Sequence, residues 1–196
     1  PEAVADMNTH YCMRYTKGVD YRLVAVVIDE LVILDRTVVI VTLGCAVLMY
    51  NYFTFDFQES AHGRAPAMAT GIKRVRPDLM VFTYQGDGDL ASIGMGEIIH
   101  AANRGEKFTT IFVNNAVYGM TGGQYSPLSG PGIMATTAPY SNIDQGLDVV
   151  EMAKAAGATF VARTTTYHVQ QMADIIRAAI LHDGFSVVEV MSQCPT

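Results

Sequence analysis

Two short polar segments carry the residues best suited to bind a ligand: Gly86-Asp87-Gly88-Asp89 and Asn114-Asn115. The two glycines let the backbone turn sharply and come close to an anion. Asp87 offers a full negative charge to a divalent cation, and Asn115 offers a neutral carbonyl oxygen. Mg²⁺ is usually held by such oxygen ligands, completed by phosphate and water. The pattern therefore predicts a site for Mg²⁺ and a diphosphate; two ordinary polar turns are the alternative.

Each polar segment follows a predicted strand. Leu79–Tyr84 and Thr109–Val113 are apolar runs typical of buried strands, and Ile93–Arg104 between them has the composition of a helix. Two strands joined by a crossover helix lie parallel, so both polar segments should emerge at the same edge of the sheet. Open α/β sheets bind their ligands at this edge.

Helical and extended patterns alternate along the rest of the chain, which predicts a single doubly wound α/β domain with a mostly parallel sheet. No repeat or linker divides residues 1–196. Residues 121–146, rich in Gly, Pro, Ser, Thr and Asn, form a predicted long loop; because it follows the Asn pair, a lid or a partner contact is favoured over disorder. The other expected helices are 19–31, 61–74, 149–156 and 168–182, and the other expected strands are 37–42, 158–162 and 186–191.

Composition narrows the possible partners and locations. Half of the residues are hydrophobic and only 16% are charged, which favours a large subunit interface. The net charge of −6 comes without a basic stripe and argues against a nucleic-acid partner. No apolar run reaches the roughly 18 residues that span a bilayer. The N-terminus shows no signal-peptide pattern, so a cytoplasmic location is expected.

The three cysteines, Cys12, Cys45 and Cys194, are far apart in the sequence. In a reducing compartment, metal ligation or burial is a better interpretation of such cysteines than disulfide formation.

At the two polar segments the sequence resembles thiamine diphosphate enzymes, whose signature is Gly-Asp-Gly, a helix-length spacer and Asn-Asn. Wider motifs resemble the β subunit of 2-oxoacid:ferredoxin oxidoreductases, and among these the 2-oxoisovalerate and 2-oxoglutarate group. The resemblance covers nearly the whole chain. The segments that carry it are 62–66 (HGRAP), 84–90 (YQGDGDL), 114–124 (NNAVYGMTGGQ) and Cys194-Pro195.

The resemblance implies a thiamine diphosphate-binding fold and an oxidoreductase activity. The expected reaction is the oxidative decarboxylation of a 2-oxoacid to acyl-CoA and CO₂, with electrons passing through a [4Fe–4S] cluster to ferredoxin. It also implies an α subunit that supplies the glutamate for the cofactor's pyrimidine ring, so the isolated chain should be inactive. A γ/δ or ferredoxin-like subunit, ferredoxin, the 2-oxoacid and coenzyme A are the other implied partners.

Matching the family motifs residue by residue gives each site residue an expected role. Asp87, Asn115 and the main-chain carbonyl of Val117 would bind Mg²⁺. His62 and Arg64 would contact the substrate or intermediate; without the family, they would be a structural histidine and an ordinary surface cation. The residues expected to bind thiamine diphosphate are Leu43, Gly44, Cys45, Ala46, His62, Gly63, Arg64, Ala65, Gly88, Asp89, Gly119 and Met120.

The resemblance also implies a cluster-binding N-terminal segment, residues 1–18. Cys12, Cys45 and Cys194 match three of the family's four cluster ligands, but Tyr15 occupies the fourth position. Tyrosine is a poor ligand for an iron–sulfur centre, which is normally held by four thiolates.

Several alternatives stay open at this stage. Three alternatives concern the cluster: that it is absent, that three cysteines hold it with a substitute ligand such as His10 or solvent, or that the sequence around Tyr15 is itself unreliable. A non-redox thiamine diphosphate-dependent decarboxylase or synthase subunit and a catalytically silent structural subunit are the alternative functions. Because family β subunits continue well past their Cys-Pro, a C-terminal arm is expected to be missing after Thr196.

Overall fold

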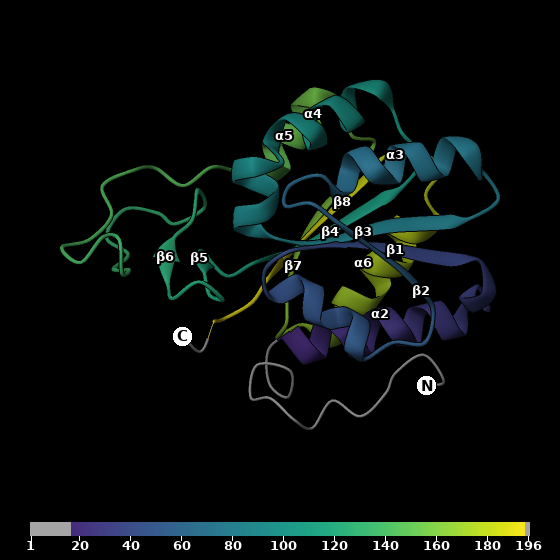
Figure 1. The fold of residues 1–196 in the computed structure, drawn as a ribbon, viewed down its shortest axis with the longest axis horizontal. Helices are drawn as coiled ribbons and strands as arrows, with labels where there is room; N and C mark the ends of the chain where they lie inside the picture. The colour runs from purple at the N-terminus through teal and green to yellow at the C-terminus, as the bar shows by residue number, and fades with distance from the viewer. Residues whose placement is uncertain (1–16, 195–196) are drawn as a thin grey trace.

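A computed structural model describes residues 17–194 of the chain. It contains one central sheet with helices on both faces (Figure 1). All six strands of this sheet are parallel, in the order β2-β1-β3-β4-β8-β7. The predicted doubly wound α/β domain is therefore confirmed. The strands are β1 (Thr37–Thr42), β2 (Asp56–Ser60), β3 (Met80–Gly86), β4 (Thr109–Asn114), β7 (Phe160–Thr165) and β8 (Ser186–Met191).

Figure 1 shows how the five longer helices are divided between the two faces of the sheet. One face is covered by α3 (Ala65–Val75), α4 (Met95–Arg104) and α5 (Val149–Ala156), and the other by α2 (Lys17–Glu30) and α6 (Val169–Leu181). Three short helical segments complete the list: η1 (Leu34–Arg36), η2 (Cys45–Asn51) and η3 (Asp89–Ile93).

Each face of the sheet has its own hydrophobic core. Successive residues of a strand point to opposite faces, so Val39 and Val41 of β1 pack towards α2 and α6 while Ile40 packs towards α3 and α4. Burial on both sides explains why this strand reads as a continuous apolar run. The two cores fix the carboxyl ends of the central strands, from which the predicted site residues extend.

Three of the differences from the sequence-based expectation have a clear physical reason. The edge strand β2 was not predicted because its sequence, DFQES, is mostly polar and exposed. The helix expected from residue 61 begins at Ala65, since 61–64 form a turn in which Gly63 has a φ of +78°. The strand expected from residue 158 begins at Phe160, because the Ala158 amide still closes the end of α5 by donating to Ala153 O at 3.0 Å.

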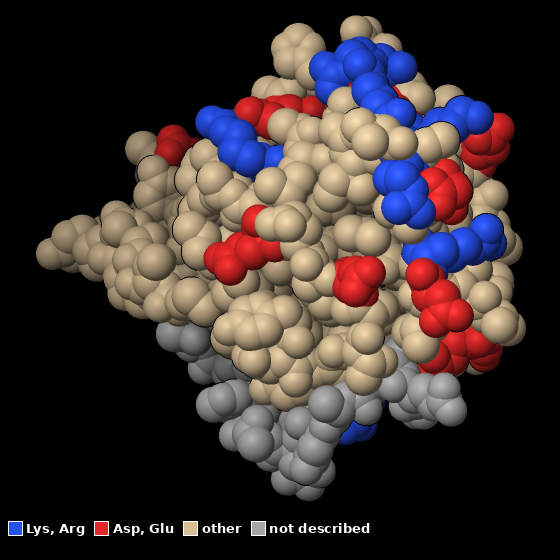
Figure 2. Space-filling view, turned by 45° about the vertical axis from the view of Figure 1, so that its right-hand side comes forward, with Lys and Arg blue, Asp and Glu red and all other residues tan. Residues whose placement is uncertain are grey.

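The long segment 121–146 projects beyond the carboxyl ends of the strands (Figure 1). It contains β6 (Gln124–Tyr125), which pairs with β5 (Val117–Tyr118) as a short antiparallel hairpin. Tyr140 is 96% exposed and Ile143 is 86% exposed. Figure 2 shows the projection almost wholly in tan, in keeping with the single charged residue of this segment, Asp144.

Two other expectations concern the ends of the chain and the membrane. The proposed cluster-binding segment 1–18, with Cys12 and Tyr15, lies outside the described residues except for its last two positions. Among the described residues, no helix is both long enough and apolar enough to cross a membrane.

Candidate functional site

A cavity of about 300 Å³ lies at the carboxyl ends of β1, β3 and β4. It brings together most of the residues that the sequence predicted for the cofactor and the cation. Three of those predicted residues, Gly63, Arg64 and Ala65, do not line it. The lining residues are Leu43, Gly44, Cys45, Ala46, His62, Gly86, Asp87, Gly88, Asp89, Asn115, Val117, Tyr118, Gly119, Met120 and Thr121.

Asp87 follows β3 directly and is only 2% exposed. Its Oδ2 atom accepts a hydrogen bond of 2.5 Å from the hydroxyl of Ser126, which lies in the projecting segment. A carboxylate has two oxygens and about four lone pairs, so it can accept this bond and still ligate a cation. The hydrogen bond orients the carboxylate of Asp87, the charged group expected to bind the cation.

The two asparagines after β4 have different structural roles. Asn114 holds the turn: its side chain donates to Glu189 Oε1 at 2.7 Å and accepts from the amide of Ala116 at 3.0 Å. Ala116 has a φ of 56°, which is unusual for a residue other than glycine. Asn115 lines the cavity, and its Oδ1 accepts from the amide of Val117 at 3.3 Å. The turn thus places Asn115 and Val117 in the lining of the same cavity as Asp87.

Gly88 permits a close approach that any side chain would block. A Cβ atom at this position would lie 2.1 Å from the ring of Tyr118. The hydroxyl of Tyr118 donates to the carbonyl of Gly88 at 3.3 Å. The close approach at Gly88 is thus made by Tyr118 itself. The carboxylate of Asp87 and the amide of Asn115 line the same cavity, and this oxygen donor set fits a diphosphate held by Mg²⁺.

Two cysteine sulfurs meet beside Gly119. A Cβ atom at this glycine would lie 3.0 Å from the sulfur of Cys194 and 3.8 Å from that of Cys45. Both thiols are free and partly buried. Within residues 17–194, no three His, Cys, Asp or Glu side chains gather as a metal-binding group. The described part therefore offers two of the four thiolates that an iron–sulfur cluster normally needs.

Asp89 is a buried carboxylate that orients His62. Its Oδ1 pairs with Nδ1 of His62 and also accepts from the amide of Gly63 at 2.6 Å. Its Oδ2 accepts from the side-chain amide of Gln85 at 2.5 Å. With Nδ1 held by the carboxylate, the ring can use its other nitrogen, Nε2, for chemistry. Arg64 instead forms an ion pair with Glu97 of α4.

Comparison with known proteins places the chain in a family. Residues 42–190 match the thiamine pyrophosphate enzyme, C-terminal TPP binding domain. The chain is 44% identical to the 2-oxoglutarate synthase subunit KorB of Methanocaldococcus jannaschii over 187 residues, which are 95% of this chain and 69% of that protein. The chain belongs to the β subunits of 2-oxoacid:ferredoxin oxidoreductases.

Other members of this β-subunit family and a solved structure agree with the assignment. The chain is 43% identical to the ketoisovalerate oxidoreductase subunit VorA of Methanothermobacter thermautotrophicus, covering 98% of this chain and 43% of that protein. It also resembles a 2-oxoglutarate:ferredoxin oxidoreductase from Magnetococcus marinus solved with 2-oxoglutarate, coenzyme A and succinyl-CoA bound. That similarity has a TM-score of 0.94 at 34% identity and covers 100% of this chain and 67% of the other. Several β-subunit relatives are thus considerably longer than this chain.

Some residues of this β-subunit site could not have been found from the sequence motifs. Ser126, Tyr118, Gln85 and Glu189 each hold a predicted site residue or its turn through a hydrogen bond. Gln85 and Tyr118 at least lie inside matching segments. Nothing in the sequence indicates that Ser126 returns to Asp87, because that contact depends on how the projecting segment folds back.

Replacement of Asp89 by asparagine should lower turnover of the assembled complex by about tenfold to 100-fold. An asparagine has nearly the same size but loses the charge opposite His62, and hydrogen bonds to charged groups contribute about 1.5–3 kcal/mol. Binding of thiamine diphosphate with Mg²⁺ should change much less than turnover. Steady-state rates and equilibrium binding, measured on the same preparation, separate the two effects.

The matched control is Glu97→Gln, which removes the partner of Arg64 and leaves the pair of Asp89 and His62 intact. Unchanged turnover in the Asp89 variant would show that the orientation of His62 does not matter for the reaction.

Proposed function

We propose that this chain is the thiamine diphosphate-binding β subunit of an enzyme that oxidatively decarboxylates a 2-oxoacid to acyl-CoA and CO₂. Electrons would leave through an iron–sulfur cluster to ferredoxin. The observation that carries the proposal is the convergence of Asp87, Asn115 and Val117 on one cavity, at the sheet edge where the family motifs end. Family members named for 2-oxoglutarate and ketoisovalerate support a 2-oxoacid substrate.

In this proposal Mg²⁺ is ligated by the carboxylate of Asp87, the side-chain oxygen of Asn115 and the carbonyl of Val117. Backbone at Gly88 and Gly119 approaches the diphosphate. The chemistry supplied by bound thiamine diphosphate is addition to the 2-oxoacid carbonyl and acceptance of the electrons left by loss of CO₂. The chain's own part is to position the cofactor, to hold Mg²⁺ and to present the ring of His62 to the cavity.

His62 and Arg64 have unequal support as groups that contact the substrate. His62 lines the cavity and is oriented by a buried carboxylate. Arg64 forms its ion pair outside the cavity lining, with 49% of its side chain exposed. Contact between Arg64 and substrate would require release from Glu97 or an approach from the outer side. His62 is therefore the stronger candidate.

The cluster would lie at the sulfurs of Cys45 and Cys194, which meet beside Gly119 next to the same cavity. These two cysteines would hold the group that accepts electrons, on the side of the cavity formed by Gly119. Cys12 is the third proposed ligand, and the fourth ligand is uncertain because Tyr15 occupies its position in the family motif.

The active site would need a partner chain. Among the described residues that line the cavity, the acidic ones are Asp87 and Asp89. Asp87 is assigned to the cation, and both oxygens of Asp89 are engaged by its own chain. An α subunit that supplies the pyrimidine-side glutamate accounts for this. A γ/δ or ferredoxin-like subunit, ferredoxin and coenzyme A complete the proposed assembly, and its cytoplasmic location remains a prediction from the sequence.

The test is anaerobic purification of the co-expressed complex, followed by iron and sulfide analysis and an assay of ferredoxin reduction. Reduction should require the 2-oxoacid, coenzyme A, thiamine diphosphate and Mg²⁺ together.

Tyr15 in place of a cysteine favours a second candidate, a non-redox thiamine diphosphate-dependent decarboxylase or synthase. Release of CO₂ from a complex without iron would establish that second candidate and exclude the ferredoxin-linked reaction.

A further inference from the structure

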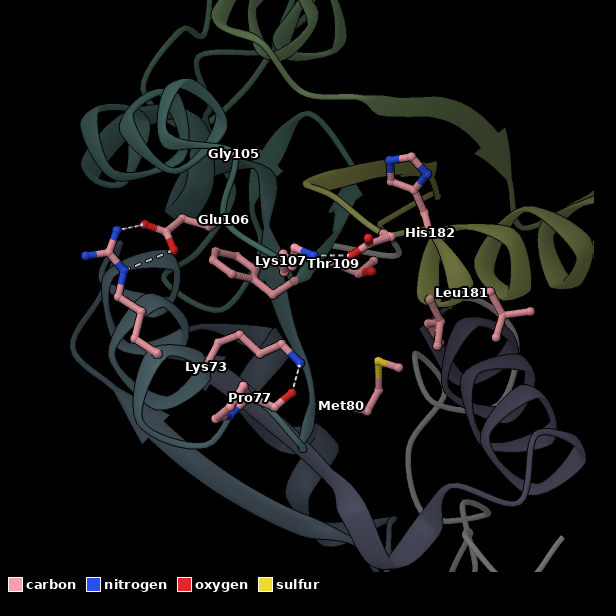
Figure 3. Close-up of a pocket in the computed structure, with 13 residues that line it drawn as sticks. Lys73, Pro77, Met80, Gly105, Glu106, Lys107, Thr109, Leu181 and His182 are labelled. Atoms are coloured by element: carbon pink, nitrogen blue, oxygen red, sulfur yellow. Dashed lines mark hydrogen bonds and ion pairs between the residues drawn. The ribbon is translucent and has the colours of Figure 1, made fainter.

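A second and larger cavity, which we call the basal pocket, lies at the edge of the sheet opposite the candidate cofactor site (Figure 3). Its volume is about 560 Å³, a size common among pockets that bind small molecules. Met80 and Thr109, the first residues of β3 and β4, line it together with residues near the ends of α3 and α6. The two cavities share no lining residue, so a ligand here would be additional to those of the proposed reaction.

The side chains that line the basal pocket carry one more positive than negative charge, with histidine counted as neutral. The cations are Lys73, Arg74 and Lys107, and the carboxylates are Glu106 and Asp183. Both carboxylates are already paired, because Arg74 donates to Glu106 at 2.6 Å and Lys107 donates to Asp183 at 2.6 Å. These pairs are drawn as dashed lines in Figure 3. The unbalanced charge is therefore that of Lys73, in a chain whose net charge is −6.

Lys73 is held by neutral acceptors. Its Nζ donates to the main-chain carbonyls of Pro77 at 2.8 Å and Leu79 at 2.6 Å. These two oxygens favour the ammonium form, which has three N–H groups. Of the three lysines with described side chains, Lys107 and Lys154 are ion-paired and Lys73 is not. Figure 3 shows its side chain extending into the pocket, so one N–H is left to bind an acceptor there.

The surroundings of Lys73 leave its ammonium short of a counter-charge. Loss of solvation by burial lowers the pKa of Lys73 and is the largest influence on it. Lys107 and Arg36 add to the lowering, whereas Asp78 and Asp183 act in the opposite direction. A bound anion would therefore stabilise the ammonium form of Lys73.

The rest of the wall decides what kind of anion fits. Met80, Phe108, Ile180 and Leu181 line the pocket with apolar surface. Phe108 and Ile180 are buried and belong to the two cores, whereas Leu181 is 62% exposed. A small inorganic anion would leave this apolar surface in contact with water. An anion with an apolar chain would cover it, which is favourable.

We propose that the basal pocket binds a small monocarboxylate with an apolar chain. Its carboxylate would accept the remaining N–H of Lys73, and its chain would lie against Met80 and Leu181. A single negative charge matches the single unbalanced positive charge. A second negative charge on the ligand would find no unpaired cation in the lining, and it would be repelled by Glu106 and Asp183.

The first test is photolabelling of the assembled complex with a hexanoate analogue that carries a diazirine on its chain. After irradiation, mass spectrometry should find the label in the segments that contain Met80 or Leu181. Excess hexanoate should suppress this labelling, whereas hexanol, which has the same chain without the charge, should not. Absence of label from both segments, or equal suppression by hexanol, would overturn the proposal.

The second test is calorimetric titration of hexanoate into variants of the complex. Lys73→Met removes the charge but keeps an apolar chain of similar length. The affinity for hexanoate should fall by about tenfold or more, the contribution of one hydrogen bond to a charged group. The matched control is Lys154→Met, the same substitution at an exposed lysine that does not line the pocket, and it should leave the affinity unchanged.

Leu181→Ala addresses the apolar part of the site at an exposed position. It should weaken the binding of hexanoate severalfold, because part of the surface that covers the chain is lost. Equal affinities of the unaltered complex, Lys73→Met and Leu181→Ala would show that hexanoate binds elsewhere. If Lys73→Met does not assemble, the photolabelling and Leu181→Ala still decide. None of these measurements requires turnover, so they are independent of the ferredoxin assay.

Discussion

Asp87→Asn should weaken the Mg²⁺-dependent binding of thiamine diphosphate by more than about 100-fold. Partners outside the direct ligands of a metal typically contribute about 10- to 100-fold to its affinity, and a direct carboxylate should contribute more. The asparagine keeps the shape of the side chain and can still accept the hydrogen bond from Ser126. The loss would therefore report the missing charge. Titration of the cofactor into the complex at a series of Mg²⁺ concentrations measures it.

Ser126→Ala is the matched control for the Asp87 experiment. It removes the neighbouring hydroxyl and leaves the carboxylate. The free energy of cofactor binding should therefore fall by only about 0.5–1.5 kcal/mol, as for the loss of an ordinary hydrogen bond. If both variants bind the cofactor as the unaltered complex does, the cation is held elsewhere. If Ser126→Ala costs as much as Asp87→Asn, the serine and not the charge is decisive.

Cys194→Ser should remove most of the iron from the anaerobically purified complex and abolish reduction of ferredoxin. A serine hydroxyl is a hard oxygen donor and replaces a thiolate poorly at an iron–sulfur centre. Binding of thiamine diphosphate should survive, because Cys194 does not line the candidate cofactor cavity. Iron and sulfide analysis, together with cofactor titration on the same sample, distinguishes loss of the cluster from general damage.

Two further variants sharpen the cysteine experiment. Cys45→Ser should also remove iron, but it should affect cofactor binding as well because Cys45 lines the cavity. Tyr15→Cys restores the family ligand and should increase the iron content. An iron content that does not change in Cys194→Ser would exclude this cysteine as a ligand.

The local parts of the site could be predicted because each lies within a few residues of a strand end. The motif around Asp87 and the Asn pair follow the buried strands β3 and β4, and parallel strands place their carboxyl ends at one edge. The edge strand β2 was missed for the opposite reason. Only one of its faces meets the core, and its mostly polar sequence lacks the apolar run that identified the central strands.

The side-chain partners of the site were beyond prediction from one sequence. Asp89 was expected to bind thiamine diphosphate, yet its side chain holds His62, which lies 27 residues earlier in the sequence. Arg64 stands in the same motif as His62, but its partner Glu97 lies on another helix. Such pairings depend on how segments that are far apart in the sequence pack together, which a local sequence pattern does not indicate.

Besides the pairing of β6 with β5, two side-chain hydrogen bonds link the projecting segment 121–146 to the site. Ser126 donates to the carboxylate of Asp87, and the hydroxyl of Ser129 donates to the carbonyl of Ala116 at 2.5 Å. A displacement of the segment that breaks both bonds changes the free energy of the site by about 1–3 kcal/mol. A subunit that grips the exposed side of the segment would therefore be allosterically coupled to the cation. By thermodynamic linkage, the subunit would change the affinity of the site for the cation by the same factor as the bound cation changes the affinity for the subunit.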